Sequence, residues 1–470
     1  MNTTRPRKAV IIGGGRSALT LATGLGADGW HVRVMTRGTM AENLGGRTGL
    51  TQLTMPLVRG HEHELGLDLW TADAPPIETV AMHMADPDPA HSWSFAAPLP
   101  TTELPLPGRG NTPVRMPVAA TSIDTRLTSA YWRQHLADLP GAAVQPGDVS
   151  LADLASLVRY RLADLIVVAT GADPALAGLF EPDSAHAGGA SARVVTQVHL
   201  DDAETWQDQD ARVVTCPDGE IMVYPVLTHT PLTAEQVRAH LNVDARPTQV
   251  RPYRAMCVQV LARPGGALDP TTAPVVRELA RPPGADPLEP GEDPIVSEYL
   301  GRHGTQALAA WRWLWPRLEE IDPALVKVFQ TAQVREKSAL LRRLEPQVRR
   351  PIAEIDGVPV LGIGDVTNTV EHVSAQGAAA STLVATTMRE QLRHLSPEQL
   401  REPQALAGTW EAYWALHGAH TRNFGAFVNG YWSGALPEGT VEAFRAAVST
   451  REGAAAWSEG LNDPHKSLRL

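Results

Sequence analysis

Residues 8–18 read KAVIIGGGRSA, a short apolar run followed by three glycines and a small-residue stretch. The apolar run at residues 8–12 predicts a buried strand, and residues 13–16 predict a tight turn. Residues 17–27 (SALTLATGLGA) predict a helix, and residues 31–36 (HVRVMT) alternate as a second strand. A strand, a helix and a strand within about thirty residues form a βαβ unit. The chain therefore opens as a nucleotide-binding domain.

The glycine turn matches the dinucleotide fingerprint Gly-x-Gly-x-x-Gly/Ala. Gly13 permits the tight turn, Gly15 lets backbone N–H groups approach a pyrophosphate, and Ala18 lets helix and strand pack closely. The helix N-terminus adds a partial positive charge that favours an anion. Thr36 and Arg37 stand where a ribose-binding acidic residue is expected, which argues against a standard NAD site. A purely structural glycine turn is the alternative.

A distant segment indicates which dinucleotide binds. Residues 361–365 read LGIGD, and a helix is expected to start near residues 376–378 and run to about residue 394. Asp365, held on a turn at Gly364, can accept hydrogen bonds from the ribityl hydroxyls of FAD. The helix N-terminus can stabilise negative charge on reduced flavin. An ordinary strand-turn-helix connection is the alternative for this segment alone, but together with the glycine turn it favours FAD.

The sequence resembles the oxygenase component of styrene and indole monooxygenases. The resemblance rests on residues 10–37, 124–127, 164–171 and 362–378, in the same order and spacing, and continues loosely through residues 421–424. It implies a two-component flavoprotein in which reduced FAD and O2 form a flavin 4a-hydroperoxide. This species would transfer one oxygen atom to a small apolar substrate, most simply by epoxidation of an aromatic alkene, an indole or a related natural product.

The resemblance and the motifs together give a set of expected site residues. Residues 45–55 and 369–379 would face the isoalloxazine ring. The FAD-binding set comprises Gly13, Gly15, Arg16, Ser17, Ala18, Thr36, Arg37, Arg47, Arg126, Val149, Thr170, Gly171, Gly364, Asp365, Gln376, Gly377 and Ala378. Thr369, His372 and Ala379 are the catalytic candidates. The last two depart from the family pattern, which has an Asn in place of Ala379, and His372 is either a proton donor, a substrate contact or a solvent-facing loop residue.

The expected fold class is α/β, with a Rossmann-like, glutathione-reductase-like FAD domain made of residues 1–171 and 351–395. The apolar run at residues 164–170 is typical of a parallel strand buried on both faces, and it should rejoin the first sheet. Residues 358–362 predict another strand. A β-sheet substrate domain is expected at residues 172–350, with residues 75–117 as irregular structure or edge strands. Residues 396–470 predict helices.

Composition limits the partners and the location. Hydrophobic residues make up 43% and charged residues 20% of the 470, as in globular proteins. A net charge of -11 without a basic stripe argues against nucleic acid. Cys216 and Cys257 are too few for a disulfide framework, and no stretch approaches the roughly 18 apolar residues of a membrane span or the length of a signal-peptide core. We expect a cytoplasmic enzyme and leave a homodimer open.

Four alternatives match parts of the sequence. Residues 311–316 (WRWLWP) are similar to a tryptophan motif of flavin-dependent halogenases, but those enzymes use an active-site lysine and none occurs between Lys8 and Lys327. A single-component NAD(P)H-dependent hydroxylase would need a second nucleotide motif, which is absent, so a separate NAD(P)H-dependent flavin reductase is expected. His61 and His63 could bind a metal, but no sequence cluster offers further ligands, and no metal is expected. A non-enzymatic flavin-binding redox protein is the last alternative.

Overall fold

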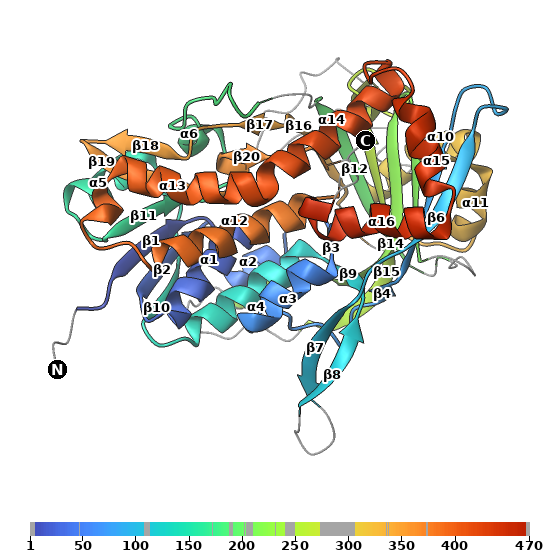
Figure 1. Ribbon diagram of the computed structural model, residues 1–470. Coiled ribbons are helices and arrows are strands. Elements are labelled where there is room, and N and C mark those ends of the chain that lie inside the picture. Colours follow the sequence, from blue (N-terminus) through green and yellow to red (C-terminus); the bar gives the residue numbers. More distant parts are fainter. Residues whose placement is uncertain are drawn as a thin grey trace, which may run out of the picture.

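The computed structural model describes most of the chain as two lobes that lie side by side and share a layer of C-terminal helices (Figure 1). The described residues are 5–46, 48–107, 113–171, 173–187, 191–201, 203, 210–230, 232–239, 250–272, 306–334, 336, 338–372 and 375–466. One lobe contains a parallel sheet and the other a larger, mostly antiparallel sheet. No helix in these ranges is long and apolar enough to cross a membrane.

The first sheet has six strands in the order β10-β2-β1-β11-β19-β18. Their bounds are β10 (Ala142–Pro146), β2 (His31–Thr36), β1 (Lys8–Ile12), β11 (Leu165–Val168), β19 (Val358–Gly362) and β18 (Ile352–Ile355). Neighbouring strands run parallel except β18, which is antiparallel to β19. The predicted return of residues 164–170 to the first sheet is confirmed, and the strand predicted at residues 358–362 forms β19 of the same sheet.

Helices cover both faces of this sheet because successive strand side chains point to opposite sides. Ile11 and Val167 pack with α1 (Arg16–Ala27), α4 (Thr125–Ala137) and α12 (Gly377–Leu392). Ile12 and Val168 pack instead with α5 (Leu151–Arg159) and α6 (Pro174–Ala177). Strand residues buried on both faces explain the uninterrupted apolar runs in the sequence.

The second sheet runs in the order β16-β12-β15-β14-β13-β5-β6. These strands are β16 (Leu340–Leu344), β12 (Arg193–Leu200), β15 (Pro252–Ala262), β14 (Gly219–His229), β13 (Ala211–Cys216), β5 (Thr79–Met84) and β6 (Trp93–Pro98). The short strands β3 (Gln52–Thr54), β4 (Pro76–Ile77) and β9 (Ala120–Ile123) also join it, while β7 (Thr102–Pro107) and β8 (Pro113–Val118) form a separate protruding ribbon (Figure 1). The second lobe is therefore built partly from residues before 172, because the chain crosses to it after β2 and returns with α4.

Two helix layers cover the second sheet. On one face, α10 (Gln306–Ile321) and α11 (Pro323–Phe329) pack through Trp311, whose ring lies 5.1 Å from that of Phe329. The residues of the halogenase-like tryptophan motif therefore lie in α10, and Trp311 and Leu314 are core residues. The other face is covered by α14 (Ala419–Ser433), α15 (Thr440–Val448) and α16 (Arg451–Asn462).

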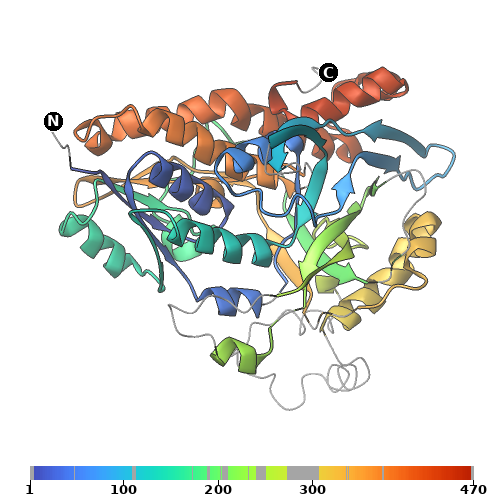
Figure 2. The same cartoon turned by 90° about the horizontal axis from the view of Figure 1, so that it is seen from below.

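The predicted C-terminal helices join the two lobes. In Figures 1 and 2 the orange and red helices lie along one side of the whole molecule. A helix α13 (Pro403–Tyr413) packs on α12, and a π-helical turn (Trp414–Gly418) connects it to α14 over the second sheet. The remaining short elements are α2 (Met40–Leu44), α3 (Pro56–Glu64), α7 (Ala234–Ala239), β17 (Gln347–Val348) and β20 (Asn368–Thr369).

Candidate functional site

A cavity of about 1150 Å³ lies where the two lobes meet. The first lobe lines it with the turn between β1 and α1, the ends of β2 and β11, and one face of α4. The second lobe contributes Leu340, Arg342 and Leu344 from β16. The ends of parallel strands in such a sheet are where ligands bind in α/β folds.

The glycine turn forms one end of this cavity. Gly13 has a φ of 130°, and a Cβ on it would approach the carbonyl oxygen of Ala169 to 2.1 Å. A Cβ on Gly15 would meet no atom within 4 Å, since it would point into open space. The turn thus places bare backbone against the cavity at the N-terminus of α1, as the dinucleotide fingerprint requires.

Asp365 lines the same cavity, next to Gly364, which has a φ of 65°. Its half-buried carboxylate makes no hydrogen bond to the side chains or backbone of the described residues. Burial raises the pKa of Asp365, and Arg342 opposes the shift. A buried carboxylate without a partner is costly, so hydroxyl groups of a bound ligand would satisfy it.

Most of the predicted FAD-binding residues meet at this cavity. The lining includes Gly13, Gly15, Arg16, Ser17, Ala18, Thr36, Arg37, Arg126, Val149, Thr170, Gly171, Gly364, Asp365 and Gly377, together with the catalytic candidate His372. Arg47 lies outside the described residues. Segment 45–55 reaches the lining at Gly46, Gly49, Leu50 and Gln52.

Four predicted residues lie near the cavity but are not part of its lining. Gln376 donates from Nε2 to the carbonyl oxygen of Leu461 at 2.8 Å. Ala378 and Ala379 are buried at the start of α12, where Ala379 packs in the core against the first sheet. Thr369 donates its hydroxyl to the carbonyl oxygen of Asp365 at 2.9 Å. The departure at Ala379 therefore falls at a packing position of the helix.

Two of the predicted cationic residues are already neutralised. Arg16 forms a buried ion pair with Glu62 and also donates to Thr54 at 3.2 Å. Arg126 pairs with Asp124 and with Glu336, at 2.5 Å and 2.9 Å. The guanidinium of each residue therefore brings little net positive charge to a phosphate.

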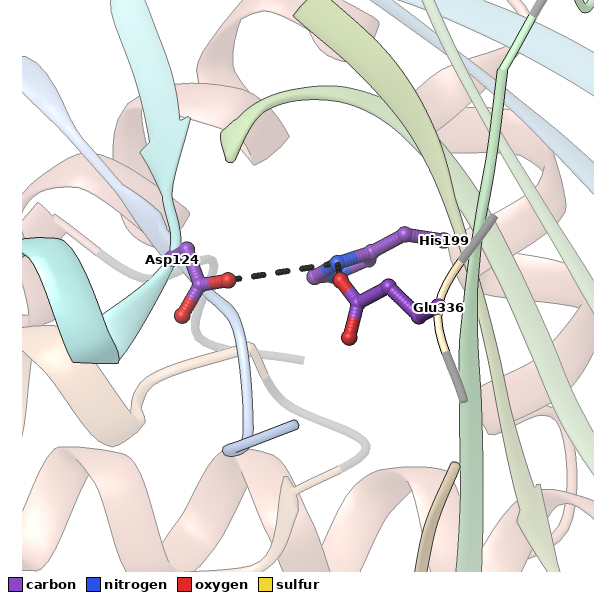
Figure 3. Close-up of side chains that lie close together, drawn as sticks. All are labelled: Asp124, His199 and Glu336. Carbon is purple, nitrogen blue, oxygen red and sulfur yellow. Dashed lines mark hydrogen bonds and ion pairs between the residues drawn. The ribbon is translucent and has the colours of Figure 1, made fainter. Parts of the chain in front are cut away.

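Arg126 belongs to a buried charge network that was not predicted from the sequence; Figure 3 shows the other three members, Asp124, His199 and Glu336. His199 on β12 donates from Nδ1 to Glu336 Oε1 at 2.8 Å and lies 4.0 Å from Asp124 Oδ2. Asp124, the N-cap of α4, also accepts from Thr228 at 2.8 Å. We call Asp124, Arg126, His199 and Glu336 the buried quartet. Its two carboxylates and two cations come from both lobes.

Electrostatics keep the quartet ionised despite its burial. Burial opposes charge on Asp124, but Arg126 holds the pKa of that carboxyl well below its usual range. Burial would raise the pKa of Glu336, but the hydrogen bond from His199 and the nearby charges lower it to about 2. Burial would lower the pKa of His199, whereas hydrogen bonds to Cys257 and Glu336 raise it to about 10. At neutral pH the quartet carries two positive and two negative charges.

Three members of the quartet are close enough together to be ligands of one metal ion. Ligand atoms of Asp124, His199 and Glu336 lie within 4.8 Å of one another, the one such group of three in the described ranges. Arg126 Nη2 donates to both carboxylates, so a guanidinium supplies the positive charge that a metal ion would supply. His61 and His63 lie on α3, apart from this group.

The quartet holds the cavity-lining segment after α2. Thr48 donates its hydroxyl to Glu336, and Thr51 Oγ1 lies 3.0 Å from His199 Nε2. Gln197 reinforces this contact by accepting from the backbone of Thr51 at 2.9 Å and donating to the carbonyl of Gly49 at 2.9 Å. The backbone that faces the cavity at residues 49–52 is therefore fixed to β12 of the second lobe.

A different arginine offers its charge to the cavity. Arg133 lies on α4 seven residues after Arg126, which places both on one helix face, and it lines the cavity while only 5% exposed. Its contact is a long bond of 3.4 Å to the carbonyl of Gly38, and its Nε has no partner among the described residues. Burial lowers the pKa of Arg133 to about 10. Helical spacing from Arg126 is the sequence signal that points to it.

His372 is the one catalytic candidate that reaches the cavity lining. Burial and nearby Arg342 lower its pKa to about 4, so the imidazole is neutral at physiological pH. A neutral imidazole can accept a hydrogen bond from a ligand and donate one, but it is not a strong acid.

No protein-family model matches this sequence, and no curated protein matches it. Solved structures do match the fold along nearly its whole length. The chain shares its fold with flavin-dependent halogenases and monooxygenases. The flavin-dependent brominase Bmp2 aligns with a TM-score of 0.54 at 10% identity, covering 98% of this chain and 97% of that one. The p-nitrophenol 4-monooxygenase PnpA from Pseudomonas putida DLL-E4 aligns with a TM-score of 0.53 at 13% identity, covering 97% and 99%.

The halogenase CmlS aligns with a TM-score of 0.53 at 12% identity and covers 99% of this chain and 74% of that one. At these identities the likeness establishes the fold alone. It confirms the predicted α/β architecture with a Rossmann-like lobe, and the function has to be argued from the site itself.

Proposed function

We propose that this protein is an FAD-dependent monooxygenase that uses reduced FAD and O2 to transfer one oxygen atom to a small apolar substrate. The observation that carries the proposal is the shape of the cavity between the lobes. Gly15 leaves open space at the N-terminus of α1. Asp365, which has no hydrogen-bond partner among the described residues, lies nearby because Gly364 packs against Ser17 of α1. The first position suits a pyrophosphate and the second a polyol.

The residues present fit FAD. Backbone N–H groups of residues 13–18 would hold the pyrophosphate with Arg133 as the cation, and Asp365 would bind the ribityl hydroxyls. The 16-residue helix α12 and exposed Arg342 would favour negative charge on the reduced ring. Bound in this way, reduced FAD activates O2 for transfer of a single oxygen atom.

The protein's own part is to orient the substrate and exclude water. Leu50, Leu340, Leu344 and Val370 bring apolar surface to the end of the cavity near His372. This lining suits an apolar, electron-rich group such as an aromatic alkene, an indole or a thioether. His372 stays neutral there and can hold a substrate polar group by a hydrogen bond. We favour epoxidation or a related oxygen transfer.

Electrons would come from a separate NAD(P)H-dependent flavin reductase. The proposal rests on the sequence, where residues 13–18 are the one Gly-x-Gly-x-x-Gly/Ala match that follows a strand and opens a helix. The other match, at residues 24–29 (GLGADG), lies at the end of α1. FAD would then bind as the reduced, anionic form.

Flavin-dependent halogenases have the same fold, and the reaction product distinguishes halogenation from oxygen transfer. No lysine lines the cavity in the described part of the chain, which favours oxygen transfer over the lysine-dependent reaction. The enzyme is assayed with styrene, indole and methyl phenyl sulfide, a free-flavin reductase and NADH, with and without bromide. An epoxide, indigo or sulfoxide supports the proposal, and a halogenated product overturns it.

FAD binding is tested separately. Gly15→Leu would fill the space meant for the pyrophosphate and should abolish binding in a fluorescence titration. Gly408→Leu is the matched control, since Gly408 lies on α13 and a Cβ there also meets no atom within 4 Å. Equal FAD affinity for the two variants would refute the cofactor assignment.

A further inference from the structure

A second cavity of about 930 Å³ lies between α14 and the adjoining ends of β12 and β15. Its apolar wall includes Phe427, Leu436 and Pro437, and its polar groups include Arg263 and Asn423. A space of this size with apolar walls and a few converging polar groups has the character of a small-molecule site. It contains none of the residues that line the first cavity.

Arg263 is the charge available to a ligand here. It directly follows β15 and is half-buried, and its guanidinium makes no hydrogen bond or ion pair within the part of the chain that the structure describes. Arg193, on the same wall, is bound by both oxygens of Glu220 at 3.1 Å and 3.3 Å and by Asn429 at 2.8 Å. Glu220 lies behind the wall, where burial raises its pKa to about 7 and Arg193 and Arg263 oppose that shift.

A thin partition separates this cavity from the proposed reaction site. Asn429 lines the second cavity and donates from Nδ2 to Glu371 Oε2 at 2.9 Å. The next residue, His372, lines the first cavity. A second connection runs through the sheet, where Arg193 on β12 pairs in register with Leu344 on β16, which also lines the first cavity. Both connections cross from one cavity to the other within a single pair of residues.

We infer that the second cavity is a separate binding site for an apolar, aromatic molecule with one anionic group that pairs with Arg263. The partition keeps this ligand apart from the first cavity, so the site is additional to the proposed reaction site. Phe427 and Leu436 would contact the ring, while the guanidinium of Arg263 would take a carboxylate or sulfonate through charge-assisted hydrogen bonds.

Binding is tested on the protein without FAD, so that the result does not depend on the proposed function. The probes are anilinonaphthalene sulfonate and its uncharged counterpart N-phenylnaphthylamine, titrated by fluorescence. Arg263→Gln should weaken sulfonate binding about tenfold and leave the neutral probe unchanged. Arg254→Gln is the matched control, at the opposite end of β15 with its guanidinium on the carbonyl of Asp73. Ala426→Trp, which fills the cavity, should weaken both probes.

Three results would overturn the inference. The first is that neither probe binds the wild type. The second is that Arg263→Gln binds each probe as tightly as the wild type does. The third is that Ala426→Trp leaves sulfonate binding unchanged, which would place the probe in the first cavity instead.

Discussion

Arg126 donates to Glu336 at 2.9 Å across 210 residues of sequence, and this bond joins helix α4 of the first lobe to the second lobe. Because the same guanidinium also binds Asp124, the charge of Arg126 is balanced by carboxylates inside the protein. The cavity segment at residues 48–52 is attached to this network through Thr48 and Thr51. The ion pairs therefore connect the stability of the lobe interface to the shape of the cavity.

Glu336→Gln should destabilise the protein by about 3 kcal/mol, because removing one partner leaves buried charges uncompensated. The measurement is urea unfolding followed by circular dichroism. Glu345→Gln is the matched control, because Glu345 forms an exposed pair with Arg343 at 2.9 Å and surface pairs contribute little. A Glu336→Gln variant as stable as the control would show that the quartet does not support the fold.

Arg133→Met should have effects of opposite sign on stability and binding. The variant removes a buried charge that has no carboxylate partner among the described residues, so the protein without FAD should unfold at a higher urea concentration. FAD affinity should fall about tenfold, because the pyrophosphate loses the cation proposed to bind it. Arg350→Met, at an exposed pair with Glu181, is the control. Unchanged FAD affinity would remove Arg133 from the proposed site.

His372 should make stability sensitive to acid. Its pKa is about 4 in the folded protein against an ordinary value of 6.5, so the unfolded chain binds the proton more tightly. The stability that follows from a neutral His372 is fully present above pH 6.5 and is lost as the pH falls towards 4. Unfolding measured from pH 7 to 4 should therefore show a smaller loss for His372→Asn than for wild type. His91→Asn, at an exposed histidine, should follow the wild type.

Electron supply gives a prediction for the whole enzyme. With NADH alone the protein should leave FAD oxidised, and a free-flavin reductase should restore turnover without forming a stable complex. Stopped-flow absorbance under anaerobic conditions measures the reduction. Rapid reduction of FAD by NADH or NADPH without the reductase would contradict the proposal and favour a single-component hydroxylase.

The amino-acid sequence alone predicted the central strands of the first sheet, although its outer strands β10 and β18 were not predicted. Strands β1, β2 and β19 were predicted to the residue, since apolar runs and glycine turns report backbone geometry that neighbouring residues determine. The glycine turn and Asp365 were predicted to share a site, and they line one cavity. These features depend on short stretches whose chemistry is local.

Only the tertiary structure decided which charged groups the cavity can use. Arg126 and Arg133 are both arginines on α4, seven residues apart. Arg126 pairs with Glu336 from the other lobe, whereas Arg133 pairs with no carboxylate in the described chain. Likewise, Ala379 lies two residues from each of the lining residues Gly377 and Ser381, yet it packs in the core. The free energy of a charge or a side chain in a protein depends on the partners that folding brings to it from distant positions. Residue type and spacing do not contain that information.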